Sequence, residues 1–244
     1  MTRSLCFACL LSLATTSFAA AGGINLSWND CGNAGVPDMT FACNTNSGAP
    51  FRLFASFDPP DTMIGLVANE WVIDLQSPQT ATLPLWWSLK GTADPTGRCR
   101  DAALVMSTNF AAGPYSCVDP WAGGIAVQGS SYVIGFSGPN TARINGVHAL
   151  VTEGSNIYPG TEYYSFALSI DRSRTVGVGA CTGCSERVCI SFSQITLYDY
   201  VSRVPLDNPR DRNFVTWQGG TVPGCCFCVP TLNRTWGEVK SLYR

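Results

Sequence analysis

Apolar and polar residues alternate with a period of two along most of this chain, which is the pattern of half-buried β-strands. In residues 64–75 (IGLVANEWVIDL) one face is apolar apart from Asn69, and the other carries Glu70 and Asp74. Residues 162–170 (EYYSFALSI) alternate in the same way. Each such segment predicts a strand with one face on a core and one face towards solvent.

The same pattern, bounded by Gly, Pro and Asn, predicts more strands along the chain. In 187–200 the apolar positions change face near Ser193, which predicts a β-bulge or a change of sheet, and Gly146 is a candidate bulge or turn. Only Thr235–Arg244 is typical of a helix, because it opens with an S/T-x-x-E capping box. We expect an all-β fold, an antiparallel β-sandwich of jelly-roll or Greek-key type with disulfide-stapled loops and a short C-terminal helix. The further strands are expected at 51–57, 83–89, 102–110, 123–128, 131–136, 141–151, 187–200 and 213–218.

The first 21 residues have the features of a secretory signal peptide. Arg3 supplies a positive charge, residues 5–13 (LCFACLLSL) form a short apolar run, and small residues follow at 19–21. Cleavage is expected after Ala21, or after Ala19 in the alternative, and a buried N-terminal helix is the other interpretation. No later stretch is long and apolar enough to cross a membrane.

These signals divide the chain into three parts. We expect a signal peptide at 1–21, a β-sandwich domain at 22–200, and a cysteine-containing tail at 201–244 that packs on the sandwich. The predicted location is outside the cytoplasm, that is extracellular, at the cell surface or in the periplasm.

Charge is scarce and nearly balanced in this sequence. The formal net charge is −2, and charged residues make up 13% of the chain, about half of the share usual in soluble proteins. Nucleic acids and anionic membranes attract proteins through basic patches. We therefore expect no nucleic-acid partner.

Ten of the 12 cysteines follow the leader, and an even number in an oxidising compartment favours disulfides. The segment 179–189 (GACTGCSERVC) holds three of them in a C-x2-C-x4-C spacing. One alternative is a zinc site formed by these three cysteines and one tail cysteine. The other is that the C-x2-C is a redox-active motif. Three cysteines cannot all pair among themselves, so at least one must reach outside, with the tail the natural partner. Local pairs Cys31–Cys43 and Cys99–Cys117 are plausible. The ten predicted disulfide cysteines are Cys31, Cys43, Cys99, Cys117, Cys181, Cys184, Cys189, Cys225, Cys226 and Cys228.

Residues for catalysis are hard to find. His148 is the single histidine and lies within a strand pattern, which suits an ordinary strand residue better than a nucleophile system. Glu70 and Asp74 share a strand face, but four residues of strand separate them by roughly 13 Å, beyond the spacing that glycoside hydrolysis uses. The acidic segment 206–211 lacks a calcium-loop pattern. We therefore predict no catalytic residues, no metal site and no cofactor.

Tryptophans are the best hint of binding. Adjacent strand residues point to opposite faces, so Trp86 and Trp87 should place one indole in the core and one towards solvent. Trp121 follows Cys117 in a loop. Exposed indoles can stack on sugars, which makes these three the candidate ligand-binding residues. The alternative is that a loop covers them.

Several motifs resemble a group of uncharacterised secreted proteins from environmental bacteria. They are spread over nearly the whole mature chain, although the tail here carries three cysteines where that group has fewer. The resemblance implies secretion and no particular activity. Its motifs are WNDCG (28–32), FACNTN (41–46), LPLWW (83–87), CR (99–100), CVDPW (117–121), GACTGC with RVCI (179–190), DRNFVTWQGG (211–220) and TWGEVKSLYR (235–244).

Together these features predict a secreted, non-catalytic surface, matrix or ligand-binding protein. A polysaccharide or cell-surface component is the expected partner, with carbohydrate as the ligand. One alternative is a carbohydrate-active enzyme whose carboxylate pair the sequence does not identify. Another is a structural or export role of the C-terminal segment.

Overall fold

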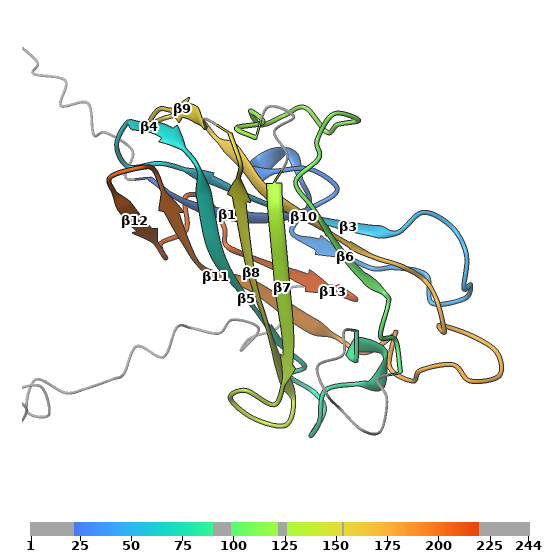
Figure 1. Cartoon of the computed structure of the whole chain (residues 1–244). Coiled ribbons are helices and arrows are strands. Elements are labelled where there is room, and N and C mark those ends of the chain that lie inside the picture. Colours follow the sequence, from blue (N-terminus) through green and yellow to red (C-terminus); the bar gives the residue numbers. More distant parts are fainter. Residues whose placement is uncertain (1–21, 90–98, 122–125, 153, 220–244) are drawn as a thin grey trace, which may run out of the picture.

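The computed structural model describes residues 22–89, 99–121, 126–152 and 154–219. The predicted signal peptide, the tail cysteines and the C-terminal helix lie outside these ranges. Within them the fold is an antiparallel β-sandwich, which confirms the expected class (Figure 1). The described helices are two short 3-10 turns, and none of them could span a bilayer.

The smaller sheet has four antiparallel strands in the order β1-β3-β10-β6. Its two central strands are nearly all buried. The first strand was not predicted, although GINLSW alternates apolar and polar residues; in the structure all six residues are buried, the polar ones included. The strand bounds are β1 Gly23–Trp28, β3 Phe51–Asp58, β6 Leu104–Ser107 and β10 Tyr163–Ile170.

The larger sheet has seven strands in the order β2-β13-β11-β5-β8-β7, and β12 pairs with the second half of β11. All of its pairs are antiparallel except β13 with β2. Because β12 and β13 belong to this sheet, the sandwich continues at least to Trp217, past the boundary predicted at residue 200. The bounds are β2 Asp38–Met39, β5 Ala68–Gln76, β7 Ala126–Ile134, β8 Thr141–Leu150, β11 Val188–Tyr198, β12 Arg203–Leu206 and β13 Phe214–Trp217.

Four predicted strands were wrong in detail. The segment 64–75 divides into β4 (Met63–Leu66), which pairs with β9 (Ser155–Ile157), and β5; Gly65, at φ 72°, takes the chain out of the extended conformation. The expected pair at 123–128 and 131–136 is the single strand β7, because β8 offers it an unbroken partner. Residues 83–89 form no strand, and Leu85–Trp87 is a 3-10 turn, η2; a second turn, η1, spans Gly32–Ala34.

Aromatic side chains join the two sheets. Trp71 on β5 stacks on Phe166 of β10, with ring centroids 3.8 Å apart, and Phe192 of β11 meets Phe166 edge-on. Trp71 also lies against Gly146 of β8, its register partner, where a methyl group would sit 2.0 Å from the indole. Gly146 is therefore not a bulge or turn as predicted. It sits in a regular strand and makes room for a core tryptophan.

Candidate functional site

The three tryptophans proposed to bind a ligand are all in the interior. Trp86 and Trp87 are 0% exposed and Trp121 is 2% exposed. A 3-10 turn sets successive side chains about 120° apart instead of 180°, so both indoles of η2 can point inward. The Trp121 indole N–H donates to the Ser165 carbonyl at 2.9 Å. The expectation of a solvent-facing indole is therefore wrong, and these residues offer no open stacking face.

A groove of about 500 Å³ lies instead on the outer face of the larger sheet. It crosses β11, β5, β8 and β7, which run side by side (Figure 1). The register of these strands aligns outward-facing residues in two rows across the sheet. The first row is Thr196, Glu70, Val147 and Gly129, and the second is Gln194, Val72, Asn145 and Ser131.

Local features of two strands shape this groove. Gly129 leaves the β7 end of the first row without a side chain. On β11 the register shifts between Phe192 and Gln194, so a bulge lies where the sequence predicted one, near Ser193. The apolar residues before and after the bulge both face the core, and the bulge turns Ser193 and Gln194 outward together. Without it, the polar residues that follow would not face the groove.

One end of the groove holds its two charged residues. Glu70 and Arg203 are both exposed and both line the groove. The Tyr198 hydroxyl donates to Glu70 Oε2 at 2.8 Å, and this hydrogen bond raises the pKa of Tyr198. The Arg203 guanidinium lies 5.9 Å from the centre of the Tyr198 ring. Tyr198 thus stands between a negative and a positive charge.

A partly buried ion pair lies on the same face of the sheet, outside the groove lining. Arg143 binds Asp74 through two hydrogen bonds of 2.7 and 2.9 Å, which raise the pKa of Arg143, and Ser193 donates to the same carboxylate at 2.6 Å. The guanidinium also lies 4.1 Å from the Phe136 ring centre. Asp74 is therefore fully engaged, while Glu70 is exposed.

A second carboxylate cluster lies away from the groove and was not found from the sequence. Arg210 is within 3.6 Å of Asp58, 3.3 Å of Glu162 and 3.9 Å of Asp211. The Asn25 amide donates to Glu162 at 2.7 Å and to Asp211 at 3.3 Å. Burial raises the pKa of Asp58. The guanidinium occupies the space among these carboxylates, so the cluster fastens the segment before β13 onto β1 and β3.

The cysteines pair over long distances in the chain. Between described residues the disulfides are Cys31–Cys117, Cys43–Cys184 and Cys99–Cys181, with sequence separations of 86, 141 and 82 residues. The local pairs Cys31–Cys43 and Cys99–Cys117 were therefore wrong, because folding brings distant loops together.

No two cysteines of the C-x2-C-x4-C segment are bonded to each other: Cys181 pairs with Cys99 and Cys184 with Cys43. Cys189 is also disulfide-bonded. Since all three cysteines of that segment are oxidised, none is a free thiolate for zinc or for redox chemistry. Pairing of this segment with Cys225, Cys226 or Cys228 stays a prediction, since the tail lies outside the described residues. In the described ranges, the sulfurs of Cys31 and Cys117 lie near Glu162 in a group that could hold a metal ion, but they are bonded to each other.

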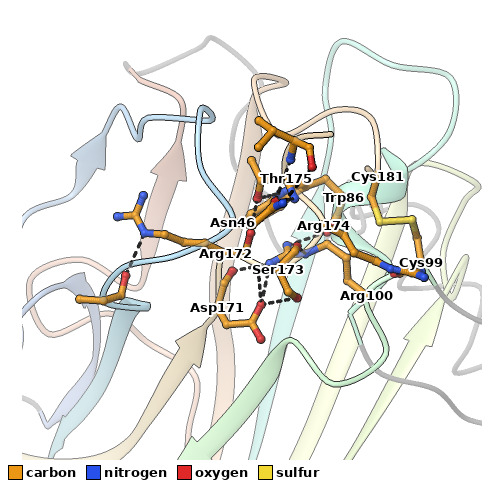
Figure 2. Close-up of polar contacts among 12 residues, drawn as sticks. Asn46, Trp86, Cys99, Arg100, Asp171, Arg172, Ser173, Arg174, Thr175 and Cys181 are labelled. Atoms are coloured by element: carbon orange, nitrogen blue, oxygen red, sulfur yellow. Dashed lines mark hydrogen bonds and ion pairs between the residues drawn. A yellow bond between two sulfur atoms is a disulfide. The ribbon is translucent and has the colours of Figure 1, made fainter. Parts of the chain in front are cut away.

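A buried arginine organises the loops beside Cys99–Cys181 (Figure 2). The Arg100 side chain is 0% exposed and stacks on Trp86, 3.6 Å from the ring centre. Its nitrogens donate to the carbonyls of Ser173 at 2.9 Å, Trp86 at 3.0 Å and Asp171. Burial lowers the pKa of Arg100 to about 10, so it is still charged at neutral pH. This residue was not singled out from the sequence, where nothing marks an arginine as buried.

His148 is a core residue on β8. It is 0% exposed, and its Nδ1 lies 3.3 Å from the Trp71 indole nitrogen, a donor, and 3.1 Å from the Asn69 amide oxygen, an acceptor, so the ring tautomer decides which of the two hydrogen bonds it makes. In the described part of the chain, Nε2 has no hydrogen-bond partner. Burial lowers the pKa of His148 to about 4.

Acidification should therefore destabilise the protein through His148. The unfolded chain binds this proton below about pH 6.5, whereas the folded chain binds it only near pH 4, so the free energy of unfolding falls as the pH drops through this window. The full shift corresponds to roughly 3 kcal/mol. Urea unfolding between pH 7 and pH 4 should show this loss in the native protein and a smaller one in His148→Asn. Parallel curves for the two proteins would contradict the assignment.

Comparison of the chain with protein-family models, with curated proteins and with solved structures finds no match. What the groove binds therefore has to be inferred from the side chains that line it.

Proposed function

We propose that this is a secreted, non-catalytic carbohydrate-binding protein whose ligand lies in the groove of the larger sheet. The observation that carries the proposal is the lining itself: two amides (Asn145 and Gln194), three hydroxyls, one carboxylate and one guanidinium beside two valines. Sugar hydroxyls both donate and accept hydrogen bonds, so they suit amide side chains, which do the same. The C–H faces of sugar rings suit valine methyl groups.

The polar groups of the groove are available to a ligand. Gln194 and Asn145 are exposed. Within the second row, the hydrogen bond from Asn145 to Ser131 is long, at 3.4 Å. Such groups can exchange water for ligand hydroxyls without breaking contacts that hold the fold together.

The number of carboxylates favours binding over hydrolysis. The described groove residues include one carboxylate, Glu70. Most glycoside hydrolases place two carboxylates beside the bond that is cleaved. The alternative of a carbohydrate-active enzyme would need a second carboxylate in this groove. Asp74, the nearest on the same strand face, is held by Arg143 and Ser193.

Secretion rests on different observations. Three disulfides are typical of proteins that fold in an oxidising compartment. The leader expected at residues 1–21 and the resemblance to secreted bacterial proteins agree with this location.

We expect the groove amides to be needed for binding. The variants Gln194→Ala and Asn145→Ala should each weaken binding to the recognised polysaccharide about tenfold, since each removes hydrogen bonds worth about 1 kcal/mol or more. A glycan array and pull-down on insoluble polysaccharides would find the ligand, and titration calorimetry would measure the change. Gln79→Ala is the matched control, because Gln79 is an exposed glutamine in the turn after β5.

Two outcomes would contradict the proposal. One is that no saccharide is retained by the native protein. The other is that binding is found but is equally strong in the Gln194→Ala and Gln79→Ala proteins. Trp86→Ala is not a useful test, since it removes a core side chain.

A further inference from the structure

We infer that the ligand is an uncharged saccharide chain that lies across the strands of the larger sheet. This inference rests on the proposed function, and it adds the charge class of the ligand, its minimum length and its direction. It is drawn from the charges of the groove and from the register of four strands.

The charges of the groove favour an uncharged ligand. The lining holds one negative group, Glu70, and one positive group, Arg203, close to the same tyrosine. The next charged groups on this face, Asp74 and Arg143, neutralise each other. An acidic sugar bound here would meet Glu70, and a cationic one would meet Arg203. A neutral hydroxyl can satisfy both, by donating to the carboxylate and accepting from the guanidinium.

The Tyr198 hydroxyl holds this charge pair in place. It donates to one oxygen of Glu70 at 2.8 Å, which leaves the other oxygen to accept from a ligand. A fixed carboxylate and a nearby guanidinium can therefore form hydrogen bonds with two neighbouring hydroxyls of one sugar unit. We assign this end of the groove to the most specific contacts with the ligand.

The second row of residues sets the length and the direction. Gln194 on β11 and Asn145 on β8 are two interstrand spacings apart, about 10 Å, with Val72 between them. A single sugar ring is too short to reach both amides. The row continues to Ser131 on β7, which brings the span to about 14 Å. A chain of several units laid across the strands would place hydroxyls on the amides and a ring face on the valine.

Affinity electrophoresis of the full protein tests the charge class. The gels contain either neutral polysaccharides (a β-glucan, a xylan or a mannan) or acidic ones (alginate or polygalacturonate), each at low and at high salt. We expect retardation by a neutral polysaccharide, with a dissociation constant that changes less than about twofold with salt, since no ligand charge is screened. For an oligosaccharide of that polymer, calorimetry should show binding at least about tenfold tighter than for the monosaccharide.

Variants of the charged pair separate the outcomes. Glu70→Gln is nearly isosteric and Arg203→Gln shortens the side chain, and both positions are exposed, so both proteins should keep the native melting temperature. Binding of a neutral chain should weaken in both. If the ligand is acidic, binding will be salt-sensitive, stronger in Glu70→Gln and lost in Arg203→Gln, which would overturn this inference and leave the proposed function intact. Equal affinity for the monosaccharide and for the oligosaccharide would contradict the inferred minimum length of the ligand. Binding to neither class would overturn the proposed function as well.

Discussion

Replacing Gly146 with alanine should destabilise the protein by about 3 kcal/mol or more, at the upper end of the usual cost of overpacking a core. The added methyl group would lie 2.0 Å from the Trp71 indole. That indole is 1% exposed and is stacked on Phe166, so it cannot move aside. We expect a lower urea midpoint and melting temperature, and a loss of near-ultraviolet circular dichroism from the displaced tryptophan.

Gly129→Ala on the next strand is the matched control. There the methyl group would meet one Val147 carbon at 3.8 Å, an ordinary contact. Alanine also lowers the conformational entropy of the unfolded chain relative to glycine, so stability should be unchanged or slightly higher. Equal stability of the Gly146→Ala and Gly129→Ala proteins would show that Trp71 does not pack against Gly146 as described.

Replacing Arg100 with methionine should destabilise the protein by about 3 kcal/mol or more. One buried and two partly buried carbonyl groups would lose their donor, at about 1 kcal/mol each, and Trp86 would lose a cation 3.6 Å above its ring. Methionine keeps much of the apolar stem, so the loss reports on the guanidinium. Asp171, half-exposed at 48%, would be solvated by water and adds little.

Arg174→Met provides the comparison for Arg100→Met. Arg174 lies in the same cluster and donates to the Cys99 carbonyl at 2.8 Å, but it is exposed (Figure 2). Its loss should change the free energy of unfolding by about 1 kcal/mol or less, because water replaces the bond. Urea unfolding of the two oxidised proteins would measure both changes. A similar effect of the two substitutions would argue against a special role of Arg100.

Alternation along the chain was enough to predict most strands of both sheets. The predictions at 51–57, 141–151, 162–170 and 187–200 correspond to β3, β8, β10 and β11, and the bulge near Ser193 is where the change of face placed it. This works because the side-chain period of a strand is a local property of the backbone. Strand β1 was missed although its residues alternate, and the prediction failed for η2, where a turn replaces a strand.

The groove could not be predicted, although its residues were visible. Glu70 was noted as a strand residue on the outward face, but its neighbours Thr196, Val147 and Gly129 come from three other strands. Side chains that lie next to each other in a sheet are set by register, and register depends on pairing between distant segments. The tryptophans were easier to pick out in the sequence, but the prediction that they bind a ligand was not supported. Their burial depends on the loops that cover them.

The sequence by itself determined the fold class, the faces of most strands and the oxidised state expected of the cysteines, because these follow from local periodicity and from composition. The tertiary structure alone decided which cysteines pair, that Trp86 and Trp87 are buried, and that Gly146 makes room for Trp71. It also decided that a polar groove crosses four strands of one sheet. The physical reason is that contacts between segments far apart in the chain, such as the 141 residues between Cys43 and Cys184, form only when the strands settle on one register and the two sheets close on a common core.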